Sequence, residues 1–145
     1  MKLCDMTCDD LLACADVFAR TFNAPPWNER WTITLAAARL AEIMHAPGFL
    51  GVVAWDDEES IGFAAGVRTT WWRGQRYNLK EMCVLPGRQR HGVGRELMRA
   101  LLAQLSAAGV GGLHLMTARG GPAAAFYTNL GFQVRDAMVM LTRRC

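Results

Sequence analysis

The sequence predicts a mixed α/β fold built on one central sheet, and three observations support this fold class. The chain has 145 residues, of which 52% are apolar and 20% charged, a balance typical of a globular domain with a sizeable core. Apolar residues recur at helical spacing in some segments and form short strand-like runs in others. No repeat, linker or low-complexity segment interrupts the chain, so we expect a single domain over residues 1–145.

The N-terminal half predicts a strand, two helices and a hairpin. A first strand is expected at Lys2–Met6, and Asp9 or Asp10 can cap a helix that continues to about Thr21. A second helix is expected over about Thr32–His45, because a Pro-Gly pair follows it. Four consecutive acidic residues then indicate a solvated hairpin turn without a site role. The strands that flank this turn are expected at Phe49–Trp55 and Ser60–Val67.

The C-terminal half predicts strands around one long helix and one short helix. The long helix covers Val93–Ala107, because apolar residues repeat there every four positions and Gly109 supplies a stop. A buried strand is expected at Gly112–Met116, in which His114 has a structural role. The remaining elements are a strand at Tyr77–Leu85, a short helix at Ala123–Asn129 and one or two strands within Phe132–Leu141.

Charge and composition argue against several classes of protein. The net charge is only +3 and the positive charge is local, so we expect no nucleic-acid partner. No apolar run is long enough to cross a bilayer and the first residues lack the apolar core of a signal peptide, so we expect a cytoplasmic protein without a membrane partner. The five cysteines include no C-x-x-C pair, so we expect reduced thiols and predict no metal site.

The most informative segment is Glu81–Arg95, which reads as a strand, a basic loop and the glycine-rich start of a helix. Gly92 and Gly94 allow the backbone to approach a ligand closely. The first N–H groups of the helix have no internal partners, and together with nearby cations they suit a phosphate. These cations are Arg88, Arg90, His91 and Arg95.

Two common phosphate-binding motifs do not fit this segment. A P-loop needs Lys and then Ser or Thr after its last glycine, whereas Arg95 and Glu96 follow Gly94. A dinucleotide-binding loop needs three glycines and a later acidic residue, whereas only two glycines occur here and no acid lies between Glu96 and Asp136. What remains is the pattern Gln89-x-x-Gly92-x-Gly94.

Two motifs resemble the GCN5-related N-acetyltransferase (GNAT) family. Gln89-x-x-Gly92-x-Gly94 resembles the loop that binds the pyrophosphate of acyl-CoA in that family, and the segment from Ala123 through Tyr127 to Gly131-Phe132 is similar to the one that closes its fold. The element order agrees along nearly the whole chain. The resemblance implies a mostly antiparallel central sheet of about six to seven strands flanked by about four helices. It also implies an N-acetyltransferase that moves an acetyl group from acetyl-CoA to an amine by direct attack in a ternary complex.

The resemblance also implies where the cofactor binds. Backbone groups at the end of the central strand would hold the pantetheine arm, the glycine-rich loop would wrap the pyrophosphate, and the strands after Val84 and after Gly112 would splay apart to admit the cofactor. Many members carry an Asn seven residues before the tyrosine, where this chain has Gly120, so that contact stays open. The expected cofactor-binding residues are Met82, Cys83, Val84, Gln89, Arg90, His91, Gly92, Val93, Gly94 and Arg95.

Two residues are expected to be catalytic, and each has an alternative interpretation. Tyr127 would protonate the departing thiolate, because a phenol is protonated at neutral pH; alternatively it only packs the helix or bonds the sulfur. Glu81 would accept the proton of the amine, directly or through a water, from the face of the strand that it shares with Cys83; alternatively it is a structural carboxylate paired with Arg or Lys. Reserve candidates for the base are Glu29, Glu42 and His45.

The acceptor side is predicted from several tryptophans and one carboxylate. Aromatic walls near a carboxylate suit a cationic amine, and the expected substrate residues are Trp27, Glu29, Trp31 and Trp72. These tryptophans are equally compatible with a core or a dimer contact, and an apolar strand around Val139–Leu141 is a candidate for pairing two copies in a homodimer. Two functions compete with the acetyltransferase. One is a non-catalytic acyl-CoA-binding or sensing module, and the other is a transferase that uses a different acyl-CoA donor.

Overall fold

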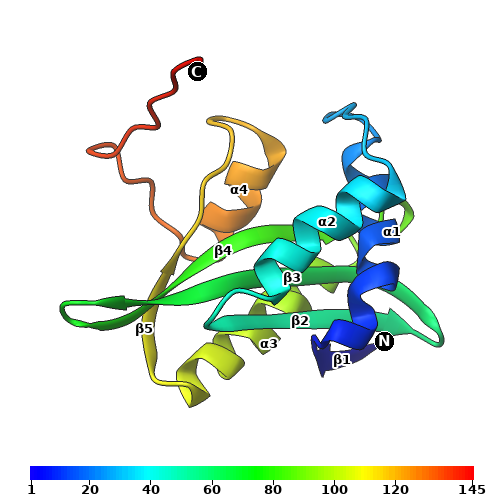
Figure 1. The fold of residues 1–145 in the computed structure, drawn as a ribbon, viewed down its shortest axis with the longest axis horizontal. Helices are drawn as coiled ribbons and strands as arrows, with labels where there is room; N and C mark the ends of the chain where they lie inside the picture. The colour runs from blue at the N-terminus through cyan, green and yellow to red at the C-terminus, as the bar shows by residue number, and fades with distance from the viewer. The chain divides into compact units, whose positions relative to one another are not determined.

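The computed structural model describes residues 1–145, which form two compact units, Met1–Leu115 and Met116–Cys145. The first unit contains one five-stranded sheet in the order β1-β2-β3-β4-β5 together with three helices (Figure 1). The second unit contains α4 (Pro122–Asn129) and the C-terminal segment. The strands are β1 (Lys2–Asp5), β2 (Phe49–Asp56), β3 (Glu59–Trp71), β4 (Gly74–Val84) and β5 (Val110–His114).

The sheet is mostly antiparallel, as expected. The first three pairs of neighbouring strands are antiparallel, and only β4 and β5 are parallel. The β3–β4 ladder is the longest and extends from Gly62↔Val84 to Trp71↔Gly74. Its register shifts between Ala65 and Gly66, which leaves Lys80 as an extra residue on β4. The extra residue is a β-bulge, and it decides which face each later β4 side chain occupies.

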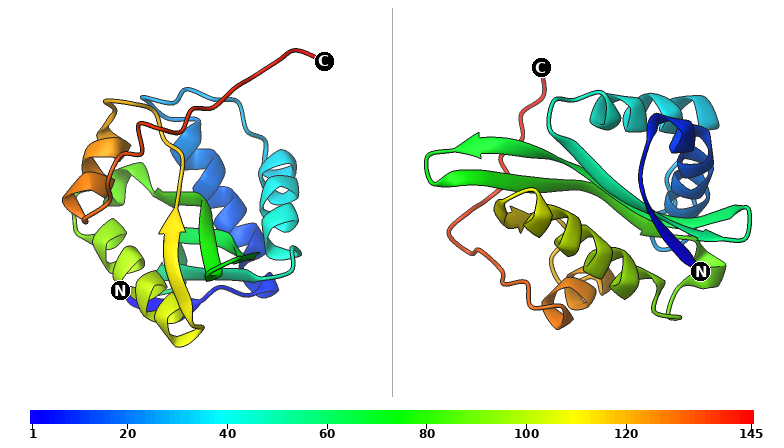
Figure 2. Two further views of the ribbon diagram at one scale, coloured as in Figure 1. Left: turned by 90° about the vertical axis from the view of Figure 1, so that its left-hand side faces the viewer. Right: turned by 90° about the horizontal axis from the view of Figure 1, so that it is seen from below.

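The helices of the first unit cover the two faces of its sheet. These helices are α1 (Leu11–Phe22), α2 (Ile33–Met44) and α3 (Val93–Ala107). Figures 1 and 2 show α1 and α2 on one face and α3 on the other. Apolar side chains fill both interfaces, for example Phe18 of α1 and Leu101 of α3. Tyr77 is fully buried, and its hydroxyl donates to the Leu50 carbonyl at 2.7 Å.

The predicted helices are confirmed, with one difference at the start of α1. The carboxylate of Asp10 does not cap α1; it accepts a hydrogen bond from the Thr7 backbone N–H at 2.7 Å and closes a short 3₁₀ turn at Cys8–Asp10. Helix α2 is capped by Thr32, whose hydroxyl accepts from the Leu35 N–H at 3.0 Å. Helix α3 has the predicted bounds. None of the helices is long and apolar enough to cross a membrane.

The prediction of six to seven strands was wrong, because the C-terminal strands are absent. No strand forms within Phe132–Leu141. A strand requires a neighbour whose backbone groups complete its ladder, and the second unit contains a helix but no strand. The apolar residues Met138–Leu141 are consequently 71–88% exposed. The strand expected at Val139–Leu141 as a dimer contact is therefore not formed in this chain.

Strand β5 also differs from its prediction. It covers Val110–His114 rather than Gly112–Met116, and it is largely exposed rather than buried. The reason is that β5 lies at the edge of the sheet and pairs only with β4, while two of its five residues are glycines without side chains to bury. His114 is accordingly exposed, so its interpretation as a buried structural residue was wrong.

The two hairpins are tighter than the sequence indicated. Asp56 and Glu59 end and begin strands, which leaves only Asp57-Glu58 as the turn between β2 and β3. Asp57 has φ +51°, a left-handed conformation that Asp tolerates in turns. The β3–β4 hairpin likewise turns at Trp72-Arg73, so the segment expected to be a loop is mostly strand.

Candidate active site

The last half of β4 is an open edge of the sheet. Strand β5 pairs with β4 only from Gln75 to Asn78, so the residues from Leu79 to Val84 have no neighbour on that side. On the other side, the Leu85 N–H donates to the Ile61 carbonyl at 2.9 Å. Because antiparallel pairs alternate between bonded and non-bonded, the backbone N–H and C=O of Met82 and Val84 point away from β3. Because β5 ends at His114, opposite Asn78, this part of β4 has polar backbone groups without a strand partner on that side.

A compact loop connects this edge to α3. The Gln89 side-chain amide donates to the Val84 carbonyl at 2.9 Å and folds the loop back onto the strand. Arg90 and Gly92 have φ values of +64° and +83°. The left-handed region favours glycine, which explains Gly92 at the position that starts the helix. A Cβ at Gly92 would meet no atom within 4 Å, so the side of the loop it faces is open.

The N-terminus of α3 supplies donors at the end of this loop. The first intrahelical bond runs from the Glu96 N–H to the Gly92 carbonyl at 3.0 Å, so the N–H groups of Val93, Gly94 and Arg95 lie before it. Arg90, His91 and Arg95 are exposed beside these donors. Backbone donors and cations therefore meet at one place, which suits an anionic group such as a pyrophosphate.

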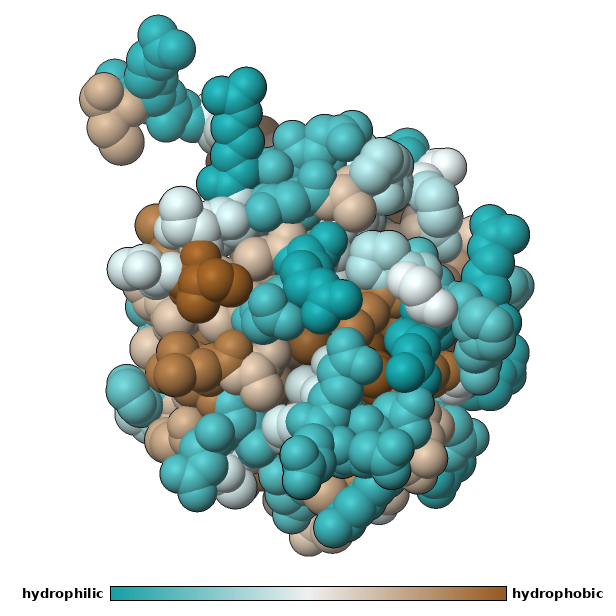
Figure 3. Space-filling model, turned by 90° about the vertical axis from the view of Figure 1, so that its right-hand side faces the viewer, coloured by the Kyte–Doolittle hydropathy of each residue, from teal (hydrophilic) through white to brown (hydrophobic).

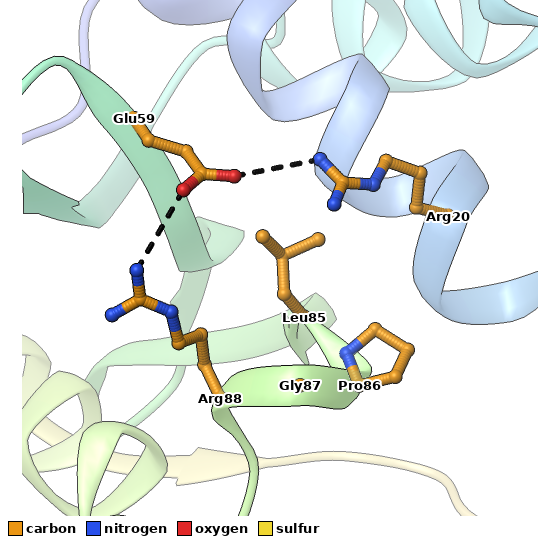
Figure 4. A pocket seen from close by; sticks show the side chains of 6 residues that line it. All are labelled: Arg20, Glu59, Leu85, Pro86, Gly87 and Arg88. Carbon is orange, nitrogen blue, oxygen red and sulfur yellow. Dashed lines mark ion pairs between the residues drawn. The ribbon is translucent and has the colours of Figure 1, made fainter.

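Arg88 directs its guanidinium to the β2–β3 hairpin and differs in this from the other loop cations. It forms ion pairs with Asp56 and, at 3.7 Å, with Glu59, whose other oxygen lies 3.6 Å from Arg20 of α1 (Figure 4). The hydrogen bond and charge of Arg88 lower the pKa of Asp56. An open pocket of about 390 Å³ is lined here by Arg20, Glu59, Leu85, Pro86, Gly87 and Arg88. Two acids expected only to be solvated thus anchor the start of the loop.

Glu81 points toward the helices α1 and α2. Its Oε1 lies 3.1 Å from Nε of Arg39 on α2, and its side chain is 18% exposed. Burial raises the pKa of Glu81, the bond to Arg39 partly offsets this rise, and the charge of Glu29 adds to it. A carboxylate with a raised pKa is better matched to accepting a proton near neutral pH. The contact with Arg39 also fits a structural carboxylate, so the observed geometry is compatible with both roles of Glu81, the catalytic base and the structural partner of an arginine.

Cys83 shares the face of β4 that Glu81 occupies. Its thiol forms a side-chain hydrogen bond with Thr21 of α1, while Glu81 contacts Arg39 of α2. Both helices lie on the same side of the sheet (Figure 2). Burial raises the pKa of Cys83 far above its ordinary value. A buried thiol that resists ionisation is a poor nucleophile, so Cys83 packs as a small apolar residue.

The loop between α1 and α2 presents Glu29 and two tryptophans. Trp31 packs edge-on against Phe18 with ring centroids 4.7 Å apart, and its indole N–H donates to Glu29 at 3.0 Å. Trp27 packs on Phe22 at 5.6 Å. Asn23, which the sequence did not single out, fixes this loop through two hydrogen bonds to the Trp31 backbone, at 2.7 and 2.9 Å. Asn23 could have been singled out from the sequence, because an Asn that directly follows a predicted helix and precedes a Pro-Pro pair is typical of a residue that fixes a loop.

Trp72 lies away from the other expected substrate residues. It is 75% exposed at the tip of the β3–β4 hairpin, where the guanidinium of Arg73 lies 4.2 Å from its ring centroid. Arg76 stacks on Trp71 in the same way at 4.7 Å. Figures 1 and 2 show this hairpin and the α1–α2 loop at opposite ends of the sheet. The structure therefore brings Trp27, Glu29 and Trp31 together and leaves Trp72 apart.

Tyr127 belongs to the second unit, on α4. Its ring is half-buried and contacts Phe126 and Phe132, with centroids 5.2 and 5.4 Å away. Gly131 follows the helix with φ +92°, a left-handed conformation that commonly ends a helix. Gly120 also has a left-handed φ, of +71°, and this turn precedes the helix. The tyrosine is thus held by an aromatic cluster within its own unit.

The face that contains α1 and the β2–β3 hairpin carries no broad apolar patch. Figure 3 shows the molecule from the right-hand side of Figure 1, and hydrophobic side chains appear there only as separate small areas among hydrophilic ones. Single apolar side chains scattered in this way are normal on protein surfaces.

Comparisons with known proteins agree with this geometry. The family model described as "Acetyltransferase (GNAT) domain" matches residues 47–134. A comparison with the sequences of curated proteins finds no match.

Several solved structures share the fold. The aminoglycoside N-acetyltransferase AAC(6')-Iy in complex with CoA is 19% identical, with 99% of this chain and 95% of that chain covered and a TM-score of 0.78. A probable acetyltransferase is 15% identical, with 100% and 98% covered and a TM-score of 0.80. The aminoglycoside 6'-N-acetyltransferase AAC(6')-IG from Acinetobacter haemolyticus is 14% identical, with 100% and 99% covered and a TM-score of 0.78.

At these identities the structural likeness establishes the fold, and the family match establishes more. The matched residues 47–134 are more than half of the chain and include the glycine-rich loop and the segment with Tyr127. The chain therefore belongs to the GNAT acetyltransferase family.

Proposed function

We propose that this chain transfers the acetyl group of acetyl-CoA to an amine by direct attack in a ternary complex. The observation that carries the proposal is the open edge of β4 over Leu79–Val84, which leads directly into the glycine-rich loop and the N-terminus of α3. An extended ligand with a pyrophosphate at one end requires this order of backbone groups and anion-binding donors.

The residues present fit acetyl-CoA, which supplies an activated acetyl group when bound. The outward-pointing backbone groups of Met82 would bond the pantetheine arm, since the Val84 carbonyl already accepts from Gln89. The N–H groups at the start of α3, with Arg90 and Arg95 beside them, would hold the pyrophosphate. The open space beside Gly92 leaves room for the phosphates to approach the backbone. Arg88 takes no part in this contact, because its guanidinium is engaged by Asp56 and Glu59.

Three groups would perform the chemistry. Glu81 accepts a proton from the amine, because only a neutral amine has the lone pair needed for attack. The Val84 N–H, at the open edge, donates to the oxygen on which negative charge develops. The role of Tyr127 as proton donor to the departing sulfur is proposed from the family motif alone.

The acceptor is proposed to be a cationic amine. Glu29 and the rings of Trp27 and Trp31 are grouped on the α1–α2 loop, and the charge of Glu29 acts on Glu81. A carboxylate and aromatic faces together attract ammonium groups. The similarity to aminoglycoside N-acetyltransferases supports testing aminoglycosides among these amines.

The other two functions have weaker support. A non-catalytic acyl-CoA-binding module is favoured only by Gly120 in place of the usual Asn, and the left-handed φ of Gly120 gives this glycine a conformational reason. A different acyl donor, such as a carboxylated one, gains no support from Arg73 and Arg76, because both guanidinium groups stack on tryptophans at the distant hairpin.

The test is release of CoA from acetyl-CoA, followed with a thiol-reactive dye, in the presence of spermidine, kanamycin, lysine or a short peptide. We expect release that depends on one of these amines, and a decrease of kcat by roughly 10²–10⁴ in Glu81→Gln. The dye reaction of the exposed Cys8 and Cys145 is subtracted with protein alone. Calorimetric binding of acetyl-CoA without release by any amine would favour the non-catalytic module instead.

A further inference from the structure

Arg39 and Glu81 form an ion pair between a helix and the central strand of the candidate site. The two residues are 42 positions apart in the sequence, and Nε of Arg39 lies 3.1 Å from Oε1 of Glu81. Their side chains are 35% and 18% exposed, so the carboxylate is more shielded from water than the guanidinium. Breaking such a pair by removing one partner leaves an uncompensated charge in a poorly solvated place.

The groups around Glu81 make Arg39 its compensating cation. Glu29, on the α1–α2 loop, contributes a like charge. Cys83, two residues along β4 and next to α1, presents a thiol that burial keeps neutral. Arg39 of α2 is the group among these that stabilises the ionised carboxylate, through both its hydrogen bond and its charge.

We propose that Arg39 is a positioning residue for Glu81. Arg39 holds the Glu81 carboxylate ionised and oriented on the helix-covered face of β4, so that this carboxylate can accept the proton of the acceptor amine. This inference rests on the proposed function, in which Glu81 is the base. In the proton transfer, Glu81 gains one proton and becomes a neutral carboxylic acid, while Arg39 keeps its own proton throughout. Arg39 is suited to this role, since its guanidinium does not lose a proton in proteins.

Without Arg39, burial and the like charge of Glu29 would act on Glu81 without opposition. A buried carboxylate without a counter-charge binds a proton more tightly, because desolvation penalises its charged form. Over the pH range in which Glu81 titrates, a larger share of the molecules would then carry a protonated Glu81, which cannot accept a proton from the amine. The single Nε–Oε1 contact also fixes the rotamer of Glu81, so its loss would leave the carboxylate less ordered.

The first experiment follows the ¹³C resonance of the Glu81 side-chain carboxyl by NMR during a pH titration of the full chain, and it needs no acceptor. The resonance is assigned by its absence in Glu81→Gln. We expect the titration midpoint to move to higher pH in Arg39→Met and to return toward the wild-type midpoint in Arg39→Lys, which restores the charge. Arg99→Met, which removes an exposed arginine paired with Glu96 on α3, should leave the midpoint unchanged.

An unchanged Glu81 midpoint in Arg39→Met would overturn the inference. Should Arg39→Met not fold, Arg39→Gln takes its place, because Gln keeps an amide donor but removes the charge. The same shift to higher pH is expected, and its absence has the same consequence.

The second experiment is kinetic and uses the amine that the wild-type enzyme acetylates. The acidic limb of the pH profile of kcat/KM should move to higher pH in Arg39→Met, so that the loss of activity relative to the wild type grows as the pH falls. The KM for acetyl-CoA should stay unchanged. Full activity in Glu81→Gln would instead remove Glu81 as the base, a failure of the proposed function that the NMR result distinguishes from a failure of the Arg39–Glu81 link.

Discussion

Two arginine–carboxylate contacts hold the two ends of the candidate site, and they affect their carboxylates in opposite ways. Arg39 meets Glu81 where the carboxylate is mostly shielded from water, and the pKa of Glu81 is raised because burial outweighs the arginine. Arg88 meets Asp56 at the surface, and the pKa of Asp56 is lowered because little burial opposes the arginine. Burial thus decides whether an arginine partner leaves a carboxylate as a poised base or as a permanently charged anchor.

The largest expected effect concerns the backbone of the loop that Arg88 anchors. Gly92→Glu should weaken CoA binding at least about a hundredfold, because like-charge contacts cost several kcal/mol. The new carboxylate would occupy the open space that faces the proposed phosphate site. Isothermal calorimetry with CoA measures the change.

A matched variant separates charge from backbone strain at this position. Gly92→Ala carries the strain of φ +83° without the negative charge, so it should lose far less CoA affinity than Gly92→Glu. Wild-type affinity in Gly92→Glu would show that CoA does not bind at this loop. The loop that Arg88 anchors would then be no part of the CoA site.

The next effect concerns the proton donor, which belongs to neither arginine contact. Tyr127→Phe should lower kcat at least about tenfold and leave the affinity for CoA nearly unchanged, because only the hydroxyl is removed. The ring contacts with Phe126 and Phe132 stay available to phenylalanine. Steady-state kinetics and calorimetry measure the two quantities, and a variant with full kcat would leave Glu81 as the catalytic side chain to be tested.

Local patterns predicted the elements well, whereas the contacts that set up the site are non-local. The periodic apolar residues of Val93–Ala107 marked α3, and the pair Pro47-Gly48 marked the end of α2, at nearly their observed bounds. The strand argument that put Glu81 and Cys83 on one face also succeeded, because the bulge at Lys80 lies before Glu81 and leaves the alternation after it intact.

The contacts of Arg39 and Arg88 had no signal in the local sequence. Arg39 is 42 residues from Glu81, and Arg88 is 32 residues from Asp56, so topology brings each pair together. The acidic run at the β2–β3 turn has the composition of a solvated turn, and nothing local distinguishes an acid that meets an arginine. The missing C-terminal strands have the same cause, because pairing depends on a neighbour that local alternation does not supply.

A smaller effect is expected at the exposed contact. Arg88→Gln should weaken CoA binding by at most about fivefold, because exposed ion pairs contribute little and Arg88 acts only by anchoring the loop. The exchange of charges in Arg88→Asp with Asp56→Arg should recover most of the lost affinity. A hundredfold loss in Arg88→Gln, without recovery in the exchanged pair, would mean that Arg88 binds phosphate directly and that the comparison with Arg39 fails.

The smallest effect is the pH dependence of stability, and here the two contacts should have opposite signs. The pKa of Asp56 is lowered on folding, so its contribution to stability is present above the unfolded pKa of about 4 and is lost as the pH falls through the folded pKa. The pKa of Glu81 is raised on folding, so its contribution is present below its unfolded pKa and is lost as the pH rises through the folded pKa.

Urea unfolding over a series of pH values measures both contributions to stability. The stability advantage of the wild type over Asp56→Asn should shrink toward acid pH, whereas that over Glu81→Gln should shrink toward neutral pH. Two differences that change in the same direction would show that burial does not separate the two carboxylates, and the buried pair would then be an anchor like the exposed one.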